Sequence, residues 1–328
     1  MSGPPRDPIG GTIIMRVIAV SEYGATPAWT NLPRPEPGPG EILVKMVAAG
    51  LNPLDWKIAD GMLKDSVDVP FPLVLGQDGA GVVDAVGDGV TRLRHGEQVY
   101  GVFAHPERGL GSFAEYAIAR DDGPVAKMPT GMIYTQAAAV PTASTTALAM
   151  VDEAGVDSGH TVLVVGATGG VGQGLVQLAS RAGAKVIATA RDDMAGTMRR
   201  LGAEETVDHS KGDLNRQVLA VHSEGIDIVL DVVSDTTAAE HIAQLLRPGG
   251  TYVSTTYAVN PDAMEARELR GVNYDGRPSA ALLDRLSDLI DAGALRVRVE
   301  HEVPLAEAAD ALAANRAGGA RGKTVIRV

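Results

Sequence analysis

The sequence predicts an α/β fold in which a doubly wound parallel sheet follows a smaller β-rich domain. Short apolar segments separated by Pro and Gly fill the first part of the chain, and strand-like and helix-like segments alternate from about residue 160. Such alternation is typical of a parallel sheet with helices on both faces, whereas closely spaced short strands are typical of a barrel. A chain of 328 residues, 45% of them hydrophobic, is long enough to build both cores.

The β-rich domain is expected over residues 15–125. Residues 1–14 are rich in Pro and Gly, so we interpret them as a flexible extension. Strand-like segments follow at residues 15–20, 41–48, 79–86, 98–103 and 113–118.

The parallel-sheet domain is expected over residues 126–275, after a turn-prone stretch at residues 121–124. The tail, residues 276–328, contains an amphipathic helix and a final strand-like segment. It is too short for a third domain, so we expect it to rejoin the first. The predicted strands span residues 162–165, 185–189, 206–208, 226–231, 251–254 and 323–328, and the predicted helices span 171–182, a segment ending near 201, 214–222, 237–246 and 280–292.

The most informative motif is a glycine-rich turn between a predicted strand and a predicted helix. Glycine lets the backbone turn tightly and approach a pyrophosphate, while the helix N-terminus offers unpaired N–H groups to the anion. The alternative is a structural turn without a ligand, but the flanking strands and helix supply the context that the motif needs. We therefore predict dinucleotide binding at Gly166, Gly169, Gly170, Val171 and Gly172.

Composition excludes several classes of function. Lys and Arg total 29 against 41 Asp and Glu, so the formal charge is −12 and nucleic acid is an unlikely partner. The chain has no cysteine, which excludes disulfides, a thiolate nucleophile and a zinc site with Cys ligands. No apolar run reaches the length of a membrane span and no secretory signal is recognisable, so we expect a cytoplasmic protein without a membrane partner.

Four sequence blocks resemble the quinone oxidoreductase, or zeta-crystallin, group of the zinc-independent medium-chain dehydrogenases/reductases. They are AGLNPLDWK at residues 49–57, LGQDGAGVV at 75–83 with VGDGV and HGEQVYG after it, GSFAEY at 111–116 and VGATGGVG at 165–172. The resemblance covers nearly all of residues 15–328. It implies a GroES-like substrate domain over 15–125 and 276–328, a Rossmann domain over 126–275, an active site in the cleft between them and a homodimer. Zinc alcohol dehydrogenases of the same superfamily use a cysteine in the first block, which this chain lacks.

The end of the second predicted Rossmann strand indicates which nicotinamide cofactor binds. An NAD site places Asp or Glu there, whereas this chain has Thr189, Ala190 and Arg191. A guanidinium pairs with a 2′-phosphate through two hydrogen bonds, so we predict NADPH; the alternative is that Arg191 is a solvated surface residue. His209 aligns with a position near the adenosine in the family, and an ordinary surface histidine is an equal alternative.

The resemblance also implies residues around the nicotinamide. It places Asn52 and Thr146 near the ring and puts Ser254 and Tyr257 after the strand that flanks it. Several other residues of these blocks are interpreted as structural: Asp55 as a cap for the Asn52 loop, Trp56 and Tyr116 as packing residues, and Asp78 as an anchor for neighbouring backbone or an arginine.

The predicted reaction is hydride transfer from NADPH to a small-molecule quinone or α,β-unsaturated carbonyl, followed by protonation. Several family members carry a tyrosine after the Asn-Pro block, but here the sequence continues as Met62, Leu63 and Lys64. The proton donor therefore stays open between water, Lys64, Tyr257 and another group. Alternatives are an enoyl-thioester or biosynthetic tailoring reductase, and an NADPH-binding protein with little turnover. Met62, Leu63 and Phe71 are expected to line an apolar pocket or to belong to the core.

Overall fold

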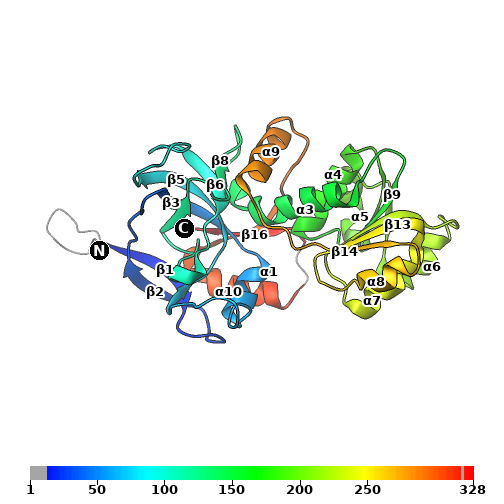
Figure 1. Cartoon of the computed structure of the whole chain (residues 1–328), viewed down its shortest axis with the longest axis horizontal. Coiled ribbons are helices and arrows are strands. Elements are labelled where there is room, and N and C mark those ends of the chain that lie inside the picture. Colours follow the sequence, from blue (N-terminus) through cyan, green and yellow to red (C-terminus); the bar gives the residue numbers. More distant parts are fainter. Residues whose placement is uncertain (1–12, 319–320) are drawn as a thin grey trace. The chain divides into compact units, whose positions relative to one another are not determined.

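The computed structural model describes residues 13–318 and 321–328, which fold as two compact units (Figure 1). Unit 1 contains the described residues of Met1–Thr142, Pro278–Asp291 and Val297–Val328, and unit 2 contains Ala143–Arg277 and Ala292–Arg296. The sequence led us to expect divisions at residues 125/126 and 275/276. The predicted flexible extension lies outside the described residues except for Ile13 and Ile14, and Ile14 already begins the first strand.

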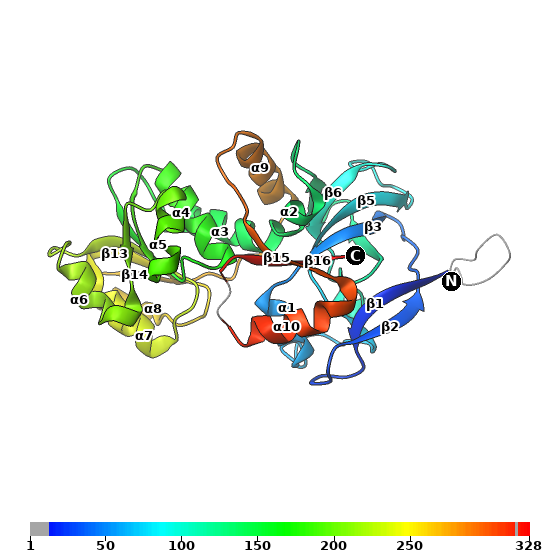
Figure 2. The ribbon, with the colours of Figure 1, turned by 180° about the vertical axis from the view of Figure 1, so that it is seen from behind.

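Unit 1 is built on two β-sheets. Its smaller sheet contains β1 (Ile14–Val20), β2 (Ala28–Pro33) and β4 (Leu73–Val74), in the order β2-β1-β4. Its larger sheet contains β3 (Glu41–Gly50), β5 (Asp78–Val86), β6 (Gln98–Val102), β7 (Tyr116–Arg120), β8 (Val125–Lys127), β15 (Val299–Pro304) and β16 (Lys323–Arg327). The order is β15-β16-β3-β5-β6-β8, and β7 also pairs with β3. The antiparallel pairing of β16 with β3 brings the C-terminal segment back to the start of the chain (Figure 2).

The described part of unit 1 also contains the helices α1 (Pro53–Ala59), α2 (Tyr134–Ala138), α9 (Ala280–Asp291) and α10 (Ala308–Arg316), with short 3-10 turns at Pro106–Arg108 and Leu305–Glu307. α1 begins where the sequence favours a helix start. Asn52 is the extended N-cap residue, Pro53 occupies the first helical position, and the Asp55 carboxylate accepts the Asn52 N–H at 2.7 Å.

Unit 2 has a six-stranded parallel sheet. Its strands are β9 (Thr161–Val165), β10 (Lys185–Thr189), β11 (Glu205–Val207), β12 (Ile226–Asp231), β13 (Leu246–Ser254) and β14 (Arg270–Asn273), in the order β11-β10-β9-β12-β13-β14. Its helices are α3 (Pro141–Ala154), which begins in unit 1, α4 (Gly170–Arg181), α5 (Asp192–Arg200), α6 (Leu214–Leu219), α7 (Thr236–Ile242) and α8 (Pro261–Glu265), with 3-10 turns at His209–Lys211 and Ala243–Leu245. α4 lies on one side of the sheet and α7 and α8 on the other (Figures 1 and 2).

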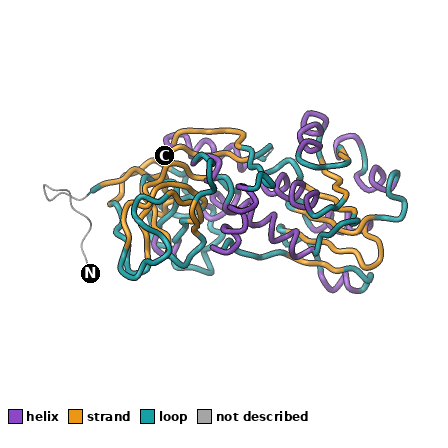
Figure 3. The backbone as a smooth tube through the Cα atoms, turned by 90° about the horizontal axis from the view of Figure 1, so that it is seen from above, coloured by secondary structure: helices purple, strands orange, loops and turns teal. Residues whose placement is uncertain are grey.

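The predicted fold class is confirmed, with local corrections. The helix expected over residues 237–246 ends sooner: α7 stops at Ile242, a 3-10 turn follows, and Leu246 already belongs to β13. The strand expected from residue 113 begins at Tyr116, because the Phe113 N–H bonds to the Leu75 carbonyl of another segment instead of extending the ladder on β3. The tube view shows how strands and helices alternate along unit 2 (Figure 3). Within the described ranges, no helix has the length and apolar character that crossing a bilayer requires.

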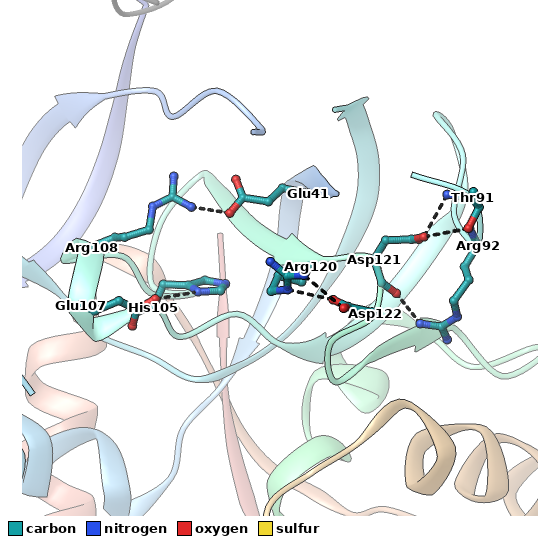
Figure 4. A network of polar contacts seen from close by, with 9 residues as sticks. All are labelled: Glu41, Thr91, Arg92, His105, Glu107, Arg108, Arg120, Asp121 and Asp122. Carbon is teal, nitrogen blue, oxygen red and sulfur yellow. Dashed lines mark hydrogen bonds and ion pairs between the residues drawn. The ribbon is translucent and has the colours of Figure 1, made fainter. Parts of the chain in front are cut away.

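A polar network stabilises one end of the larger sheet of unit 1 (Figure 4). The Asp121 carboxylate accepts the backbone N–H groups of Thr91, Arg92 and Leu93 at 2.9, 3.0 and 3.1 Å. Burial acts to raise the pKa of Asp121, but these donors and the Arg92 charge outweigh it and leave the pKa below its usual value. The same view shows three side-chain pairs: Arg108 with Glu41, His105 with Glu107, and Arg120 with Asp122.

Candidate functional site

The glycine turn of unit 2 connects β9 to α4, as predicted. Gly166 has φ +81°, which favours glycine, and a Cβ atom there would lie 2.7 and 2.8 Å from the Val233 and Val232 side chains. The turn is also tied to the neighbouring strand, because the Thr189 hydroxyl accepts the Gly166 N–H at 3.0 Å and donates to the Val164 carbonyl at 3.2 Å. Gly166 and Thr189 are therefore parts of one rigid turn.

The turn fits a pyrophosphate. A Cβ atom on Gly169 would meet only the Gly166 carbonyl oxygen, at 3.6 Å, so the space beside Gly169 is open. Gly169 is the N-cap residue of α4 and, as a glycine, has no side chain that could cap the helix. The N–H groups of the first turn, from Gly170 to Gly172, are those that a helix leaves unpaired. Open space and free donors are what a bound anion requires.

A basic corner lies at the carboxyl ends of β10 and β11. Thr189 pairs with Val207 in the parallel ladder, so Arg191 and His209 follow adjacent strands at one edge of the sheet. Both side chains are exposed. The Lys211 ammonium contacts the Asp192 carboxylate at 2.5 Å and therefore belongs to the same corner. The sequence analysis missed Lys211, although its position two residues after His209 was a usable signal.

The remaining predicted residues of unit 2 lie on two other segments. Ser254 is fully buried at the end of β13, and its hydroxyl is within 2.9 Å of the Thr256 hydroxyl. Tyr257 is 59% exposed with φ +58°, a conformation uncommon outside glycine, and the Asp275 carboxylate raises its pKa by hydrogen bonding. Thr146 is half-buried on α3.

The loop after β12 completes the surroundings of the glycine turn, and the sequence analysis missed it. The buried Asp231 carboxylate accepts the N–H groups of Val233 and Ser234 at 2.9 and 3.0 Å, and the Tyr252 hydroxyl at 2.5 Å. These bonds hold the loop whose valines face Gly166. The signal was available, since parallel sheets of this type bind ligands beyond the carboxyl ends of their strands.

Unit 1 contains a buried polar cluster around Asn52. The Asn52 amide nitrogen donates to the Asp78 carboxylate at 2.9 Å, and its carbonyl oxygen accepts from the Lys323 ammonium. Asp78 also accepts the Thr142 hydroxyl at 2.6 Å, at the start of α3. Asp78 is thus an anchor, as expected, but its cationic neighbour is Lys323 instead of an arginine, with Nζ 4.0 Å from Oδ2. We name Asn52, Asp55, Asp78 and Lys323 the buried cluster.

Burial shifts the proton affinities of this cluster. It raises the pKa of Asp55 to about 7, with the nearby Asp78 charge in the same direction and the Asn52 N–H and Lys323 opposing it. Burial likewise raises the pKa of Asp78 and lowers that of Lys323, while the attraction between the two works against both shifts. With one ammonium beside two carboxyl groups, the cluster is suited to holding one extra proton.

Lys64 lies apart from this cluster. It is exposed and lines a cavity of about 440 Å³ together with Tyr23 and residues 65–69 of unit 1. Trp56 donates its indole N–H to Asn315 on α10 at 3.1 Å, and the Arg34 guanidinium stacks 4.5 Å from the Tyr116 ring. Both aromatic residues therefore pack as interpreted. Met62 and Phe71 are exposed by 59% and 38%, which excludes a core role for them.

The residues present do not fit the zinc site of zinc-dependent relatives. The chain offers no cysteine ligand. In the part of the chain that the structure describes, no group of three or more His, Asp or Glu side chains could hold a metal ion. We derive no catalytic step through zinc.

Comparisons with known families match both parts of the chain. The alcohol dehydrogenase GroES-like domain family matches residues 38–130, and the zinc-binding dehydrogenase family matches residues 201–326.

Similar proteins span almost the whole chain. The chloroplast envelope quinone oxidoreductase homolog of Arabidopsis thaliana is 32% identical, over 95% of this chain and 98% of that protein. The NADPH-dependent alkenal/one oxidoreductase of the same plant is 30% identical, over 95% and 79%. Among solved structures, the quinone oxidoreductase from Coxiella burnetii matches with a TM-score of 0.86 and 28% identity, over 96% of this chain and all of that one.

Proposed function

This chain belongs to the quinone oxidoreductase group of the medium-chain dehydrogenase/reductase superfamily and is a nicotinamide-dependent oxidoreductase, and we propose from that premise that it uses NADPH to reduce a quinone or an α,β-unsaturated carbonyl. The observation that carries the proposal is the glycine turn, with its open space at Gly169, beside a basic corner without a carboxylate at the position of Arg191. NADH sites place a carboxylate there for the ribose hydroxyl.

The basic corner supports NADPH over NADH. Arg191 has no side-chain partner among the described residues, so its guanidinium is available to pair with a 2′-phosphate. Lys211 pairs with Asp192 and neutralises the carboxylate that follows Arg191 in the sequence. A carboxylate at the strand end would repel the phosphate, whereas Ala190 and Arg191 do not.

The chain's own residues would bind the cofactor and orient it toward the acceptor. When bound, the cofactor supplies the hydride. The α4 N-terminus would hold the pyrophosphate and Arg191 the 2′-phosphate, while Asn52 and Thr146 are the residues that the family resemblance assigns to the nicotinamide. We propose solvent water as the proton source, and the Asp275 hydrogen bond, which raises the pKa of Tyr257 and makes it a weaker acid, disfavours that residue as the donor.

The test is NADPH oxidation, followed by absorbance, with a panel of quinones, enones and enoyl thioesters beside an NADH control. Turnover with quinones or enones supports the proposal. Preference for thioesters would favour a tailoring or enoyl-thioester reductase, and tight NADPH binding without turnover would favour a binding protein.

We also propose a homodimer. β14 (Arg270–Asn273) is the terminal strand of the unit 2 sheet, so one of its edges has no strand partner among the described residues. Such an edge is a template for pairing with a second copy. Light scattering in solution tests this: a monomeric mass would contradict it.

A further inference from the structure

Lys323 is a buried lysine at the start of β16, only 5% exposed. Its ammonium donates to the Leu51 carbonyl at 2.8 Å and to the Asn52 side-chain oxygen. The pairing of β16 with β3 explains this position, since Ile326 lies opposite Ala49 and the Leu51 N–H bonds to Thr324. A buried ammonium is costly unless several partners satisfy it, so this residue is not there for packing alone.

The chemistry of its neighbours fixes the orientation of the Asn52 amide. Lys323 can only donate, and the ionised Asp78 carboxylate can only accept. A rotated amide would set its NH2 against the ammonium and its oxygen against the carboxylate. Both partners therefore impose the same orientation. The amide oxygen faces Lys323, and the amide nitrogen faces Asp78 at 2.9 Å.

Lys323 also polarises this amide. A cation at the carbonyl oxygen draws electron density from the nitrogen, and hydrogen bonds in a chain strengthen one another in a water-poor interior. Without Lys323, the amide could rotate and Asp78 would lose its neutralising charge, although Thr142 would still donate to it. Asn52 would then present a mixture of donor and acceptor groups.

We propose that Lys323 is a positioning residue for the reduction, which holds the Asn52 amide in one orientation beside the reacting nicotinamide. This inference rests on the proposed function, because the function gives Asn52 its place in the site. Lys323 acts through Asn52 and does not itself touch the reacting atoms. This positioning role accounts for a buried ammonium that neither the hydride transfer nor the protonation uses.

The experiment compares the full-length wild-type chain with Lys323→Met, Lys323→Arg, Asn52→Ala and the double variant Lys323→Met/Asn52→Ala. Lys127→Met is the matched control, since this lysine is exposed and pairs with Glu97 on the surface of unit 1. We measure kcat and KM for an acceptor, the Kd for NADPH by fluorescence, and urea unfolding. The side-chain amide resonance of Asn52, assigned by its loss in Asn52→Ala, reports the amide directly.

Misplacement by about 1 Å can cost roughly 100-fold in rate, so we expect Lys323→Met to lower kcat by about that factor, with a smaller change in KM. Asn52→Ala should lower kcat similarly, and the double variant should be no slower than the slower single variant. Lys323→Arg should recover part of the rate, and Lys323→Met should shift the Asn52 resonance. A purely structural lysine would instead change the unfolding midpoint without this coupling.

The outcomes separate the inference from the function beneath it. If the wild type turns over and Lys323→Met matches it, or if the two single effects multiply in the double variant, the inference is wrong and the function stands. If the wild type reduces no acceptor, the function is wrong. The inference is then judged by the Asn52 resonance and the NADPH Kd, and an unmoved resonance with unchanged affinity overturns it. If Lys323→Met does not fold, Asn52→Ala decides: a wild-type kcat in that variant would show that the Asn52 amide has no part in the reduction and would overturn the inference.

Discussion

Gly172 packs directly against Gly166: a Cβ atom on Gly172 would lie 2.2 Å from the Gly166 carbonyl oxygen. No side chain fits at that distance, and the atoms in the way are backbone. Gly169, in the same motif, faces open space and has an ordinary φ of −76°. The two positions of one motif therefore require glycine for different physical reasons. Gly172 lets the helix pack on the turn, and Gly169 leaves room for a ligand.

This difference predicts opposite outcomes for two substitutions. Gly169→Val should keep the fold, because nothing clashes there, but its branched side chain should block the pyrophosphate and abolish NADPH binding. Gly172→Ala should lower the free energy of unfolding by about 1–3 kcal/mol through overpacking. Urea unfolding and NADPH fluorescence titration, run on both variants, measure the two effects. Unchanged NADPH affinity in Gly169→Val would show that the turn is not part of the cofactor site.

Arg191→Ala should weaken NADPH binding far more than NADH binding. Loss of a charge-assisted hydrogen bond costs about 1–3 kcal/mol, and only NADPH carries the 2′-phosphate that would accept it. Arg200→Ala, at the exposed C-terminal end of helix α5, whose N-cap residue is Arg191, is the matched control and should leave both affinities unchanged. Titration with each cofactor is the measurement. An equal loss of affinity for NADPH and NADH would mean that Arg191 does not bind the 2′-phosphate.

Local patterns of the sequence were enough to predict the parallel sheet and the glycine turn of unit 2. The apolar run at β9, the glycines and the next strand lie within one short stretch, so residues close in sequence are sufficient to predict them. The family resemblance, and not a local pattern, is what points to Asn52, whereas the packing of Trp56 was interpreted correctly.

The buried cluster depended on contacts that local patterns do not contain. Lys323 lies 271 residues after Asn52, and only the return of β16 onto β3 brings them together. In sequence, Lys323 is only the first, polar residue of the strand predicted over residues 323–328. Its burial follows from strand register, which a single sequence does not specify over such a separation. For the same reason, the carboxylate of Asp231 could not be linked to Tyr252 in advance.

Asp121→Asn should destabilise unit 1 at neutral pH and much less in acid. The folded state holds the pKa of Asp121 below its usual value, so the stability it contributes is present above the unfolded pKa near 4 and is lost as the pH falls through the folded pKa. Loss of the charged acceptor for the backbone N–H groups of residues 91–93 should cost about 1–3 kcal/mol at pH 7. Urea unfolding over a pH series measures it, and a difference that grows in acid would contradict the assignment.

Asp55→Asn should show the opposite pH dependence. Burial raises the pKa of Asp55 to about 7, with Asp78 reinforcing this and Lys323 and the Asn52 and Gln77 N–H groups opposing it. A raised carboxyl pKa means that the folded state binds the proton more tightly, so the stability from Asp55 is full below the unfolded pKa near 4 and is lost as the pH rises through about 7.

The asparagine keeps an acceptor for the Asn52 N–H but does not titrate. Relative to the wild type, Asp55→Asn should therefore gain stability as the pH rises from about 4 to about 7 and level off above it, whereas Asp121→Asn should show no such gain over this range. Urea unfolding of the three proteins at each pH is the measurement. Parallel curves for Asp55→Asn and the wild type would show that Asp55 is already ionised in the folded protein, and that the buried cluster holds no extra proton.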